Sequence, residues 1–291
     1  MARVESITGL EHMAARHWRG TEEDRLGGWL LRAAGGFTGR ANSALPLGDP
    51  GMPLDDALAA VTRWYRARAL PPMIVIPLPL EGDSPCHQLD NHLSERTWLT
   101  RPGPAFVMVA DLATVPPAGN SPAGGEFRVD AEPDDPWLAT YHYRGQDRQP
   151  PVLRTVLMSA PAQAFASIRG DAGEVLAVGR LSIADGWAGI TAVEVTQARR
   201  RAGLGMALTC AICAEAAARG ARQVFLQVAS DNIPARTLYE RCGFRYSSAP
   251  RSRRHAESGV LGLRPGARYV CNHGYPCVQG LGSFAKRAGR R

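Results

Sequence analysis

The sequence predicts an α/β protein, more narrowly of the α+β kind, in which a mixed and mostly antiparallel sheet is flanked by helices. The strands expected between residues 162 and 195 are joined by short turns, "GDAG" and "ADG", which are typical of antiparallel hairpins. Strands and helices then alternate. The first half of the chain repeats this alternation as a pattern, without identical residues, which predicts a degenerate second copy of one fold.

Residues 114–125, "TVPPAGNSPAGG", are rich in proline and glycine and show no apolar period, so they are predicted to be a linker. The linker separates an N-terminal domain, residues 1–113, from a C-terminal domain, residues 126–246. Residues 247–291 show no sustained period and contain many residues that break helices and strands. We predict a basic, disordered tail there.

The expected elements follow from apolar periodicity and from cap and turn residues. In the second half, strands are expected at 126–130, 162–169, 174–183, 187–195, 222–228 and from 243, and helices at 134–145, 151–160, after Gly205 and at 233–242. In the first half, strands are expected at 27–34, 40–47, 72–78 and 105–112, and helices at 54–69 and 87–98. Asp134 or Asp135 is the expected cap of the helix that begins at 134.

The net charge of +7 is concentrated in the tail. Residues 247–291 contain nine basic residues and one acidic residue, a charge of +8, so the rest of the chain sums to −1. Such a tail can contact nucleic acid or an acidic partner, but a nearly neutral body argues against nucleic acid as the main ligand. Lys286 is the only lysine among 34 basic residues, which we interpret as the codon bias of a GC-rich bacterial genome.

No apolar run approaches the ~20 residues that a membrane helix needs, and the polar start of the chain lacks the apolar core of a signal peptide. The six cysteines are scattered without the spacing of a disulfide framework. We therefore expect free thiols, no membrane partner and a cytoplasmic location.

The stretch "RRRAGLG", residues 199–205, places two glycines at the start of a helix, where phosphate groups are often bound. A P-loop needs a lysine after its last glycine, and Lys286 lies in the tail, so that interpretation fails. A dinucleotide-binding fingerprint needs a third glycine, and Leu208 stands in its place. That fingerprint also expects a parallel sheet, whereas the strands upstream are joined by hairpin turns.

A third interpretation fits better. "RRAGLG", Arg200 to Gly205, resembles the Q/R-x-x-G-x-G/A turn of the GNAT superfamily of N-acetyltransferases, and "NIPARTLYERCGF", residues 232–244, matches its N-x-x-A-x-x-L-Y-x-x-x-G-F signature. The element order of residues 126–246 is also similar. The first half resembles a degenerate copy, because "PLGDPGMPLDDAL" stands where the arginine–glycine turn would be. The chain thus resembles tandem GNAT proteins, including a group from actinobacteria.

The resemblance implies an N-acetyltransferase whose second half is catalytic. It would move an acetyl group from acetyl-CoA to a primary amine of a small molecule or protein, by direct attack in a ternary complex. The alternative is a CoA-binding regulatory or scaffold protein without transfer activity.

The resemblance also implies where acetyl-CoA binds. Gly203 and Gly205 would let the backbone wrap the pyrophosphate at a helix N-terminus, and Arg200 and Arg201 would add positive charge. A backbone N–H near a bulge around Val195 would stabilise the oxyanion, and the strands at 187–195 and 222–228 would splay to admit the pantetheine. The expected cofactor-binding residues are Val193, Val195, Arg200, Arg201, Ala202, Gly203, Leu204, Gly205, Met206, Asn232 and Ala235.

Tyr239 and Glu194 are the candidate catalytic residues. Tyr239 would protonate the leaving thiolate, or else it packs in the core or against pantetheine. Glu194 lies in the apolar run "TAVEVTQ" and would accept the proton of the amine directly or through water; otherwise it faces solvent or pairs with one of Arg199–Arg201. A water chain can also replace a dedicated base. Asn232 would bind pantetheine, or it caps its helix.

Aromatic residues at 137–143 lie where the family's first helices border the acceptor site, and they are equally consistent with a core; these residues are Trp137, Tyr141, His142 and Tyr143. No metal site is expected. The spacing of Cys86, His87 and His92 does not bring them to one helix face, and Cys210 and Cys213 are typical of small core residues. A zinc site at Cys271, His273 and Cys277 in the tail is disfavoured.

The family normally closes its sheet with one more strand after the "GF" strand. Here "SSAPRSRRHAES" stands in its place. The last strand is therefore missing, supplied by the other half of the chain, or lost to an altered C-terminus. An exposed sheet edge would favour association, of which a homodimer is the simplest form.

Overall fold

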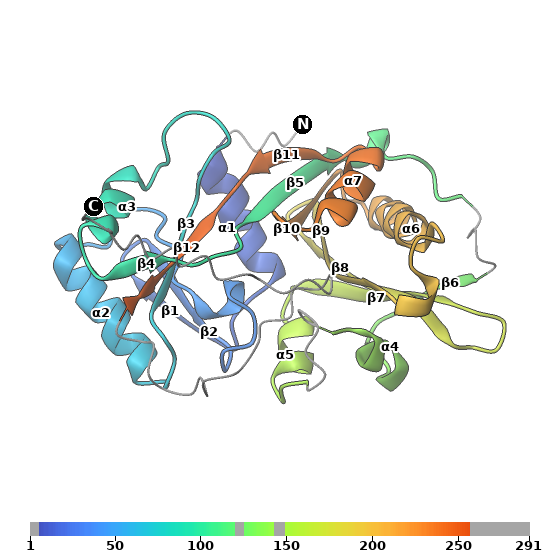
Figure 1. Cartoon of the computed structure of the whole chain (residues 1–291), viewed down its shortest axis with the longest axis horizontal. Coiled ribbons are helices and arrows are strands. Elements are labelled where there is room, and N and C mark those ends of the chain that lie inside the picture. The colour runs from blue at the N-terminus through green and yellow to red at the C-terminus, as the bar shows by residue number, and fades with distance from the viewer. Residues whose placement is uncertain (1–5, 120–124, 143–148, 257–291) are drawn as a thin grey trace, which may run out of the picture.

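The computed structural model describes residues 6–119, 125–142 and 149–256, and it confirms the α+β class with a mostly antiparallel sheet flanked by helices. The strands form a seven-stranded sheet, a three-stranded sheet and a two-stranded sheet (Figure 1). In the described ranges, no helix is both long and apolar enough to span a membrane.

The strands are β1 Glu22–Leu26, β2 Trp29–Ala33, β3 Met73–Ile76, β4 Trp98–Thr100, β5 Ala105–Asp111, β6 Glu126–Asp130, β7 Ala162–Arg169, β8 Val175–Ala184, β9 Trp187–Val195, β10 Gln223–Ala229, β11 Arg245–Ser248 and β12 Arg251–His255. The α-helices are α1 Ile7–His17, α2 Leu54–Arg66, α3 His87–Ser94, α4 Asp135–Thr140, α5 Leu153–Leu157, α6 Leu204–Ala218 and α7 Ile233–Arg241. Short 3₁₀ turns are η1 Arg40–Asn42, η2 Leu112–Thr114 and η4 Gln197–Arg199.

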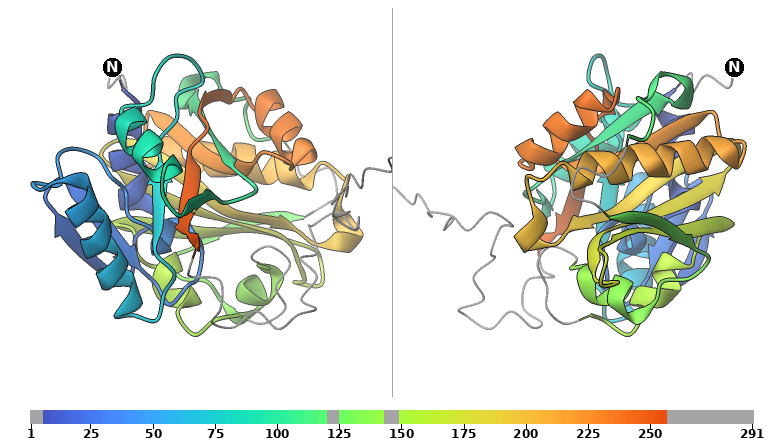
Figure 2. Two further views of the ribbon diagram at one scale, coloured as in Figure 1. Left: turned by 60° about the vertical axis from the view of Figure 1, so that its left-hand side comes forward. Right: turned by 90° about the vertical axis from the view of Figure 1, so that its right-hand side faces the viewer.

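The seven-stranded sheet has the order β11-β5-β10-β9-β8-β7-β6. Neighbours from β6 to β9 are antiparallel, and β9 with β10 is the parallel pair. Helices α6 and α7 lie on one face, while α4 and α5 lie on the opposite face (Figure 2). Two separate cores result, one under α6 around Leu208 and Ile212, and one under α4 around Trp137 and Phe165.

The first half has the same strand order in a shorter form. β1 pairs with β2, a bridge joins Leu30 of β2 to Leu45, and a parallel bridge joins Ala44 to Ile74 of β3. β12 then lies between β3 and β4. This order corresponds to β7, β8, β9, β10, β5 and β11 of the large sheet, with α2 and α3 in the positions of α6 and α7. The first half is therefore a reduced copy of the second.

Each half receives its last strand from the other half. β5 precedes the linker and pairs with β10 and β11, while β12 follows the second half and pairs with β3 and β4 (Figure 1). Of the three possibilities for the last strand of the second half, supply by the other half is therefore correct. The boundary expected after residue 113 does not separate the two sheets.

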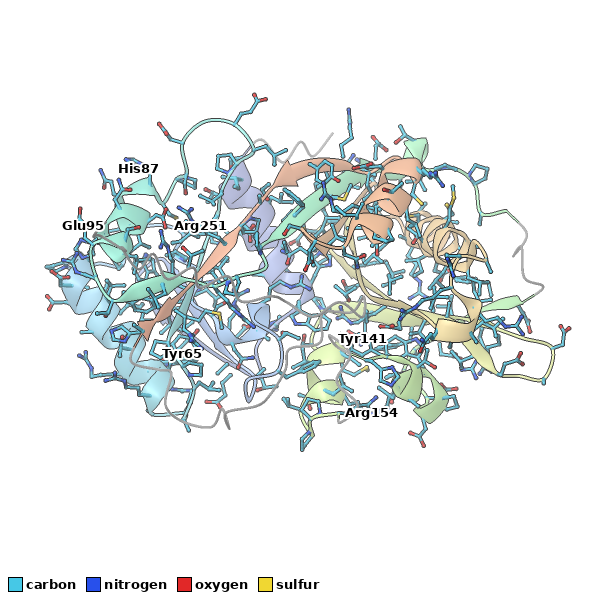
Figure 3. All side chains as sticks on the ribbon, viewed as in Figure 1. Tyr65, His87, Glu95, Tyr141, Arg154 and Arg251 are labelled. Atoms are coloured by element: carbon cyan, nitrogen blue, oxygen red, sulfur yellow. The ribbon has the colours of Figure 1, made fainter. Side chains whose placement is uncertain are left out.

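The disordered tail expected from residue 247 is wrong for its first ten residues, because β11 ends at Ser248 and β12 follows. Its charged residues acquire partners only through a distant part of the chain. Arg253 of β12 donates Nε to Oδ1 of the buried Asp90 at 2.9 Å, and Arg251, which is labelled in Figure 3, also pairs with Asp90. The rest of the tail, residues 257–291, lies outside the described residues, as do residues 120–124 of the linker.

Besides β12, three further elements are not foreseen from the sequence: α1, β1 and β4. Helix α1 begins after Ser6, whose side chain accepts a hydrogen bond from the Gly9 N–H. It packs Leu10 and Met13 against Trp187 and Phe225 of the large sheet. This N-terminal helix therefore contributes to the core of the second half, which local periodicity does not indicate.

We predict that Asp90→Asn weakens the attachment of β12. The substitution leaves the buried Arg253 guanidinium without an anion, and breaking a buried pair from one side typically costs about 3–5 kcal/mol. A large fall in Tm is expected by scanning calorimetry. The control is Asp55→Asn, which removes an exposed carboxylate that also contacts an arginine, Arg96, and should leave Tm nearly unchanged. Equal small changes in both variants would show that backbone pairing alone holds β12.

Candidate functional site

The two central strands of the large sheet separate part-way along their length. β9 and β10 are in register from Trp187↔Gln223 to Ile190↔Leu226, and their pairing ends there. β10 continues to pair with β5 as far as Ala229↔Ala105 on its other side. The splay expected between the strands at 187–195 and 222–228 is confirmed, and it begins after Ile190.

A bulge lies on β9 where the splay begins. Thr191 is opposite Arg180 of β8 and Glu194 is opposite Val178, so Ala192 and Val193 together face the single residue Gly179. The bulge is thus two to three residues earlier than the position around Val195 expected from the sequence. Ala192 has φ +55°, a conformation that costs energy for a residue with a side chain and is often found at functional sites.

Gly179, the residue opposite the bulge, lies directly under α6. A Cβ on Gly179 would lie 2.7 Å from Cδ1 of Ile212, because α6 packs directly on this part of β8. The close contact leaves no room for a side chain opposite the bulge. Gly179 is therefore required by the packing of α6 on β8.

The two glycines of the arginine–glycine turn have different roles. Gly203 is the N-cap of α6 and has φ +79°, which a glycine adopts without strain. Gly205 lies inside the first turn of α6, where an added Cβ would lie 2.8 Å from Leu238 of α7. Gly205 is thus required by helix packing. The first turn of α6 contains no acidic residue, so its backbone N–H groups form a suitable anion site.

Glu194 forms an ion pair with Arg200, one of the alternatives that the sequence offered for this residue. Its Oε1 lies 3.2 Å from Nη2 of Arg200, and only 16% of its side chain is exposed. Burial raises the pKa of Glu194, and the charges of Arg200 and His142 act in the opposite direction. Arg200 also donates Nε to the Val195 carbonyl oxygen at 3.4 Å, so its guanidinium lies at the end of β9.

Asn232 and Tyr239 have the structural roles that the sequence offered as alternatives, a helix cap and a core residue. Asn232 caps α7, since its Oδ1 accepts a hydrogen bond from the Ala235 N–H at 3.2 Å. Tyr239 is buried and packs near Phe244, with ring centroids 5.9 Å apart. Burial raises the pKa of Tyr239, which keeps the phenol protonated at neutral pH.

The aromatic residues at 137–143, on the opposite face of the sheet, do not share one role. Trp137 is a core residue, buried and donating Nε1 to the Ala166 carbonyl oxygen at 2.9 Å. Tyr141 ends α4 and lies between the sheet and α5 (Figure 3). His142 is close enough to Glu194 to affect its pKa, while Tyr143 lies outside the described residues.

Within the part of the chain that the structure describes, no group of three or more potential metal ligands comes together. Cys86 is buried and His92 contacts Asp55 at the surface. Cys210 and Cys213 are core residues, and the Cys210 thiol lies 3.9 Å from that of Cys242. Cys271, His273 and Cys277 lie outside the described residues.

Arg180 is one of several buried charged residues that were missed in the sequence, and it is the one that lies next to the bulge. Arg180 interrupts the apolar run "LAVGRLSI" of β8 in the same way that Glu194 interrupts β9, and its side chain is fully buried next to the bulge. The signal that selected Glu194, a charge inside an apolar strand, applied equally to Arg180.

The chain matches a family model over residues 5–253; the model is described as "Probable histone acetyltransferase Rv0428c C-terminal". The protein belongs to this family and to the GNAT superfamily of N-acetyltransferases. It is 31% identical to the probable histone acetyltransferase Rv0428c of Mycobacterium tuberculosis over 253 residues, covering 84% of this chain and 72% of that one. It is 26% identical to the uncharacterized N-acetyltransferase YobR of Bacillus subtilis, covering 83% of this chain and 95% of that one.

Solved structures agree on the fold. A GCN5-related N-acetyltransferase from Kribbella flavida superimposes with a TM-score of 0.62 at 20% identity, covering 81% of this chain and 90% of that one. A tandem GNAT protein from the clavulanic acid biosynthesis pathway gives 0.58 at 15% identity, covering 85% and 88%. The family assignment shows that this GNAT protein is an N-acetyltransferase, an enzyme of acyl transfer.

Proposed function

We propose that the second half of this enzyme transfers an acetyl group from acetyl-CoA to a primary amine of a small molecule or protein, by direct attack in a ternary complex. One observation carries the proposal. The opening between β9 and β10 adjoins the turn at 200–206, which leads from the end of β9 into the N-terminus of α6.

The residues present fit acetyl-CoA. The N–H groups of the first turn of α6 and the left-handed Gly203 suit a pyrophosphate, and Arg201 adds charge beside them. The unpaired edge of β9 after Ile190 offers backbone groups to the amide-containing pantetheine arm. Asn232 retains its side-chain N–H groups as donors, because the capping bond uses only its oxygen.

The corresponding position of the first half does not fit the same ligand. Helix α2 follows Pro53, which makes no capping bond, and its first turn contains Asp55 and Asp56. These carboxylates would repel a pyrophosphate at the helix N-terminus. The contrast between α2 and α6 supports a single acetyl-CoA site per chain.

The chemistry requires a neutral amine, a stabilised oxyanion and a protonated leaving group. Glu194 accepts the proton that the amine loses as its nitrogen bonds to the thioester carbon. Backbone N–H groups beside the bulge at 192–193 stabilise the carbonyl oxygen as it gains charge. Tyr239 donates its phenolic proton to the sulfur as the carbon–sulfur bond breaks, and the free thiol of CoA leaves.

The alternative, a CoA-binding regulatory or scaffold protein, is favoured by one observation. The carboxylate of Glu194, the candidate base, already forms an ion pair with Arg200. Release of free thiol from acetyl-CoA in the presence of a panel of amines distinguishes the two. Amine-dependent thiol release is expected. Binding of acetyl-CoA without release for any amine would favour the regulatory protein.

We predict that acetyl-CoA raises Tm and that Gly203→Val abolishes this shift, because valine at φ +79° cannot maintain the turn before α6. The matched control is Gly173→Val in the β7–β8 turn, where the glycine also has φ +79° and no atom would contact the new Cβ. Both variants introduce similar backbone strain, but only the first should lose the shift in Tm.

Calorimetry on the full chain should give one bound equivalent of acetyl-CoA. A second equivalent would show that the first half also binds acetyl-CoA.

We predict that Glu194→Gln lowers kcat by about 10²–10⁴-fold and removes the acid limb of the pH–rate profile. A base works in its deprotonated form, so wild-type activity should fall as pH decreases through the raised pKa of Glu194. Arg200→Gln removes the charge that lowers this pKa and should move the acid limb to higher pH. A Gln variant with near-normal rate would indicate a water relay and leave Glu194 as an ion-pair partner only.

We predict that Tyr239→Phe leaves acetyl-CoA binding almost unchanged, because the ring still packs near Phe244 and the ground-state thioester carries no charge. Turnover should fall by about 10²–10⁴-fold, in kcat and kcat/KM together, as expected for an interaction made mainly in the transition state. Near-normal turnover would make Tyr239 a packing residue. Weak acetyl-CoA binding would make it a cofactor contact instead.

A further inference from the structure

Arg180 is a fully buried guanidinium with one unused nitrogen. Its Nε donates to the Leu157 carbonyl oxygen at 2.6 Å, and its Nη1 donates to the His17 carbonyl oxygen at 3.1 Å and to Oγ1 of Thr191 at 3.3 Å. Its Nη2 has no hydrogen-bond partner in the structure. An unpaired buried N–H group of a cation is costly, so this nitrogen requires an explanation.

The charge of Arg180 is also uncompensated. Among the described residues, no carboxylate forms an ion pair with it, and a second guanidinium, that of Arg40, raises the positive charge nearby. Both guanidinium carbons lie 5.3 Å from the centre of the Trp18 ring. Burial and Arg40 lower the pKa of Arg180 to about 9, so it remains charged at neutral pH. The guanidinium of Arg180 itself therefore has no anionic partner within the described part of the chain, whereas Arg40 interacts with the buried Glu11.

Arg180 lies on the acceptor side of the reacting centre. Its partner in register, Thr191, directly precedes the bulge, and Val178, two residues earlier on β8, is opposite Glu194. Side chains two residues apart on a strand share a face and are roughly 7 Å apart. Glu194 and Arg180 therefore lie on one face of the sheet, the face on which Tyr141 packs in one core cluster with Val178.

We propose that Arg180 is a specificity-determining residue, and that the acceptor is a small amine carrying a carboxylate that binds Nη2 of Arg180 while its amine faces Glu194. This inference rests on the proposed function and defines its acceptor class. Because Arg180 is fully buried, binding requires a covering side chain to move. Tyr141 is the residue that we expect to move, since it ends α4 and packs in the core cluster that contains Val178, two residues before Arg180 on β8.

The test compares pairs of amines that differ only in the carboxylate. Suitable pairs are β-alanine and its amide, 4-aminobutyrate and its amide, and Nα-acetyl-lysine and its amide, with thiol release from acetyl-CoA as the readout. The wild-type protein should prefer the acid of at least one pair by about 10- to 100-fold in kcat/KM, as expected for a charge-assisted hydrogen bond to Nη2. The amine of β-alanine amide is less basic than that of β-alanine, so a larger fraction of it is neutral and able to attack. A preference for the acid would therefore be opposite to the intrinsic reactivity of the two amines.

Arg180→Gln should reduce this preference, the ratio of kcat/KM for acid and amide, to about one. The matched control is Arg169→Gln on β7, which removes a mostly buried arginine of the same sheet whose charge is already paired with Asp134. The control should retain the preference. If Arg180→Gln does not fold, Arg180→Lys, which keeps the charge and loses the planar fork, should retain only part of the preference.

Equal use of acid and amide by the wild-type protein, or full retention of the preference in either Arg180 variant, would overturn this inference and leave the proposed function intact. Acetylation of a lysine peptide without a free carboxylate at the rate of the best acid would also overturn it. Failure to acetylate both members of every pair, with acetyl-CoA bound, would overturn the proposed function itself.

Discussion

The exchange of β5 and β12 between the two halves is the constraint on which the rest of the structure depends. β10 has β5 on one side over its whole length and β9 on the other side for only four residue pairs. Because β5 satisfies the backbone of Gln227, Val228 and Ala229, β10 remains ordered where β9 leaves it. The opening that we assign to acetyl-CoA therefore depends on a strand from the first half of the chain.

The same exchange explains why a first half without the arginine–glycine turn is retained. β12 is fixed in the first-half sheet by Asp90, which neutralises two arginines of an otherwise unfavourable strand. Helix α1 adds a further link, because Leu10 and Met13 pack on Trp187 and Phe225 of the large sheet. Neither sheet has its full complement of strands alone. The first half is thus a structural requirement of the second, whatever its own ligand-binding capacity.

Much of the second half could be predicted from the sequence because its signals are local. Strands β6, β7 and β9 were predicted with their observed bounds from the apolar periods and the hairpin turns, and the cap at Asp134 was predicted as well. The two family motifs predicted the splay between β9 and β10 and the start of α6. Local signals could not give β12, whose charged residues become favourable only next to Asp90, 163 residues from Arg253. The position of the bulge was also missed: the structure places it at Ala192 and Val193, opposite Gly179, and not around Val195.

Two charged residues inside apolar strands define the acceptor face, and they differ in one respect. Glu194 has a partner, Arg200, from the turn that follows its own strand, so its charge is partly compensated within the protein. Arg180 has only carbonyl and hydroxyl oxygens as partners, and these satisfy two of its three nitrogens. A face with a compensated anion at one end and an uncompensated cation at the other is polar along its length. In the mechanism that we propose, such a face would orient a dipolar acceptor with its amine toward the carboxylate and its anionic group toward the guanidinium, which would place the nucleophilic nitrogen beside the bulge.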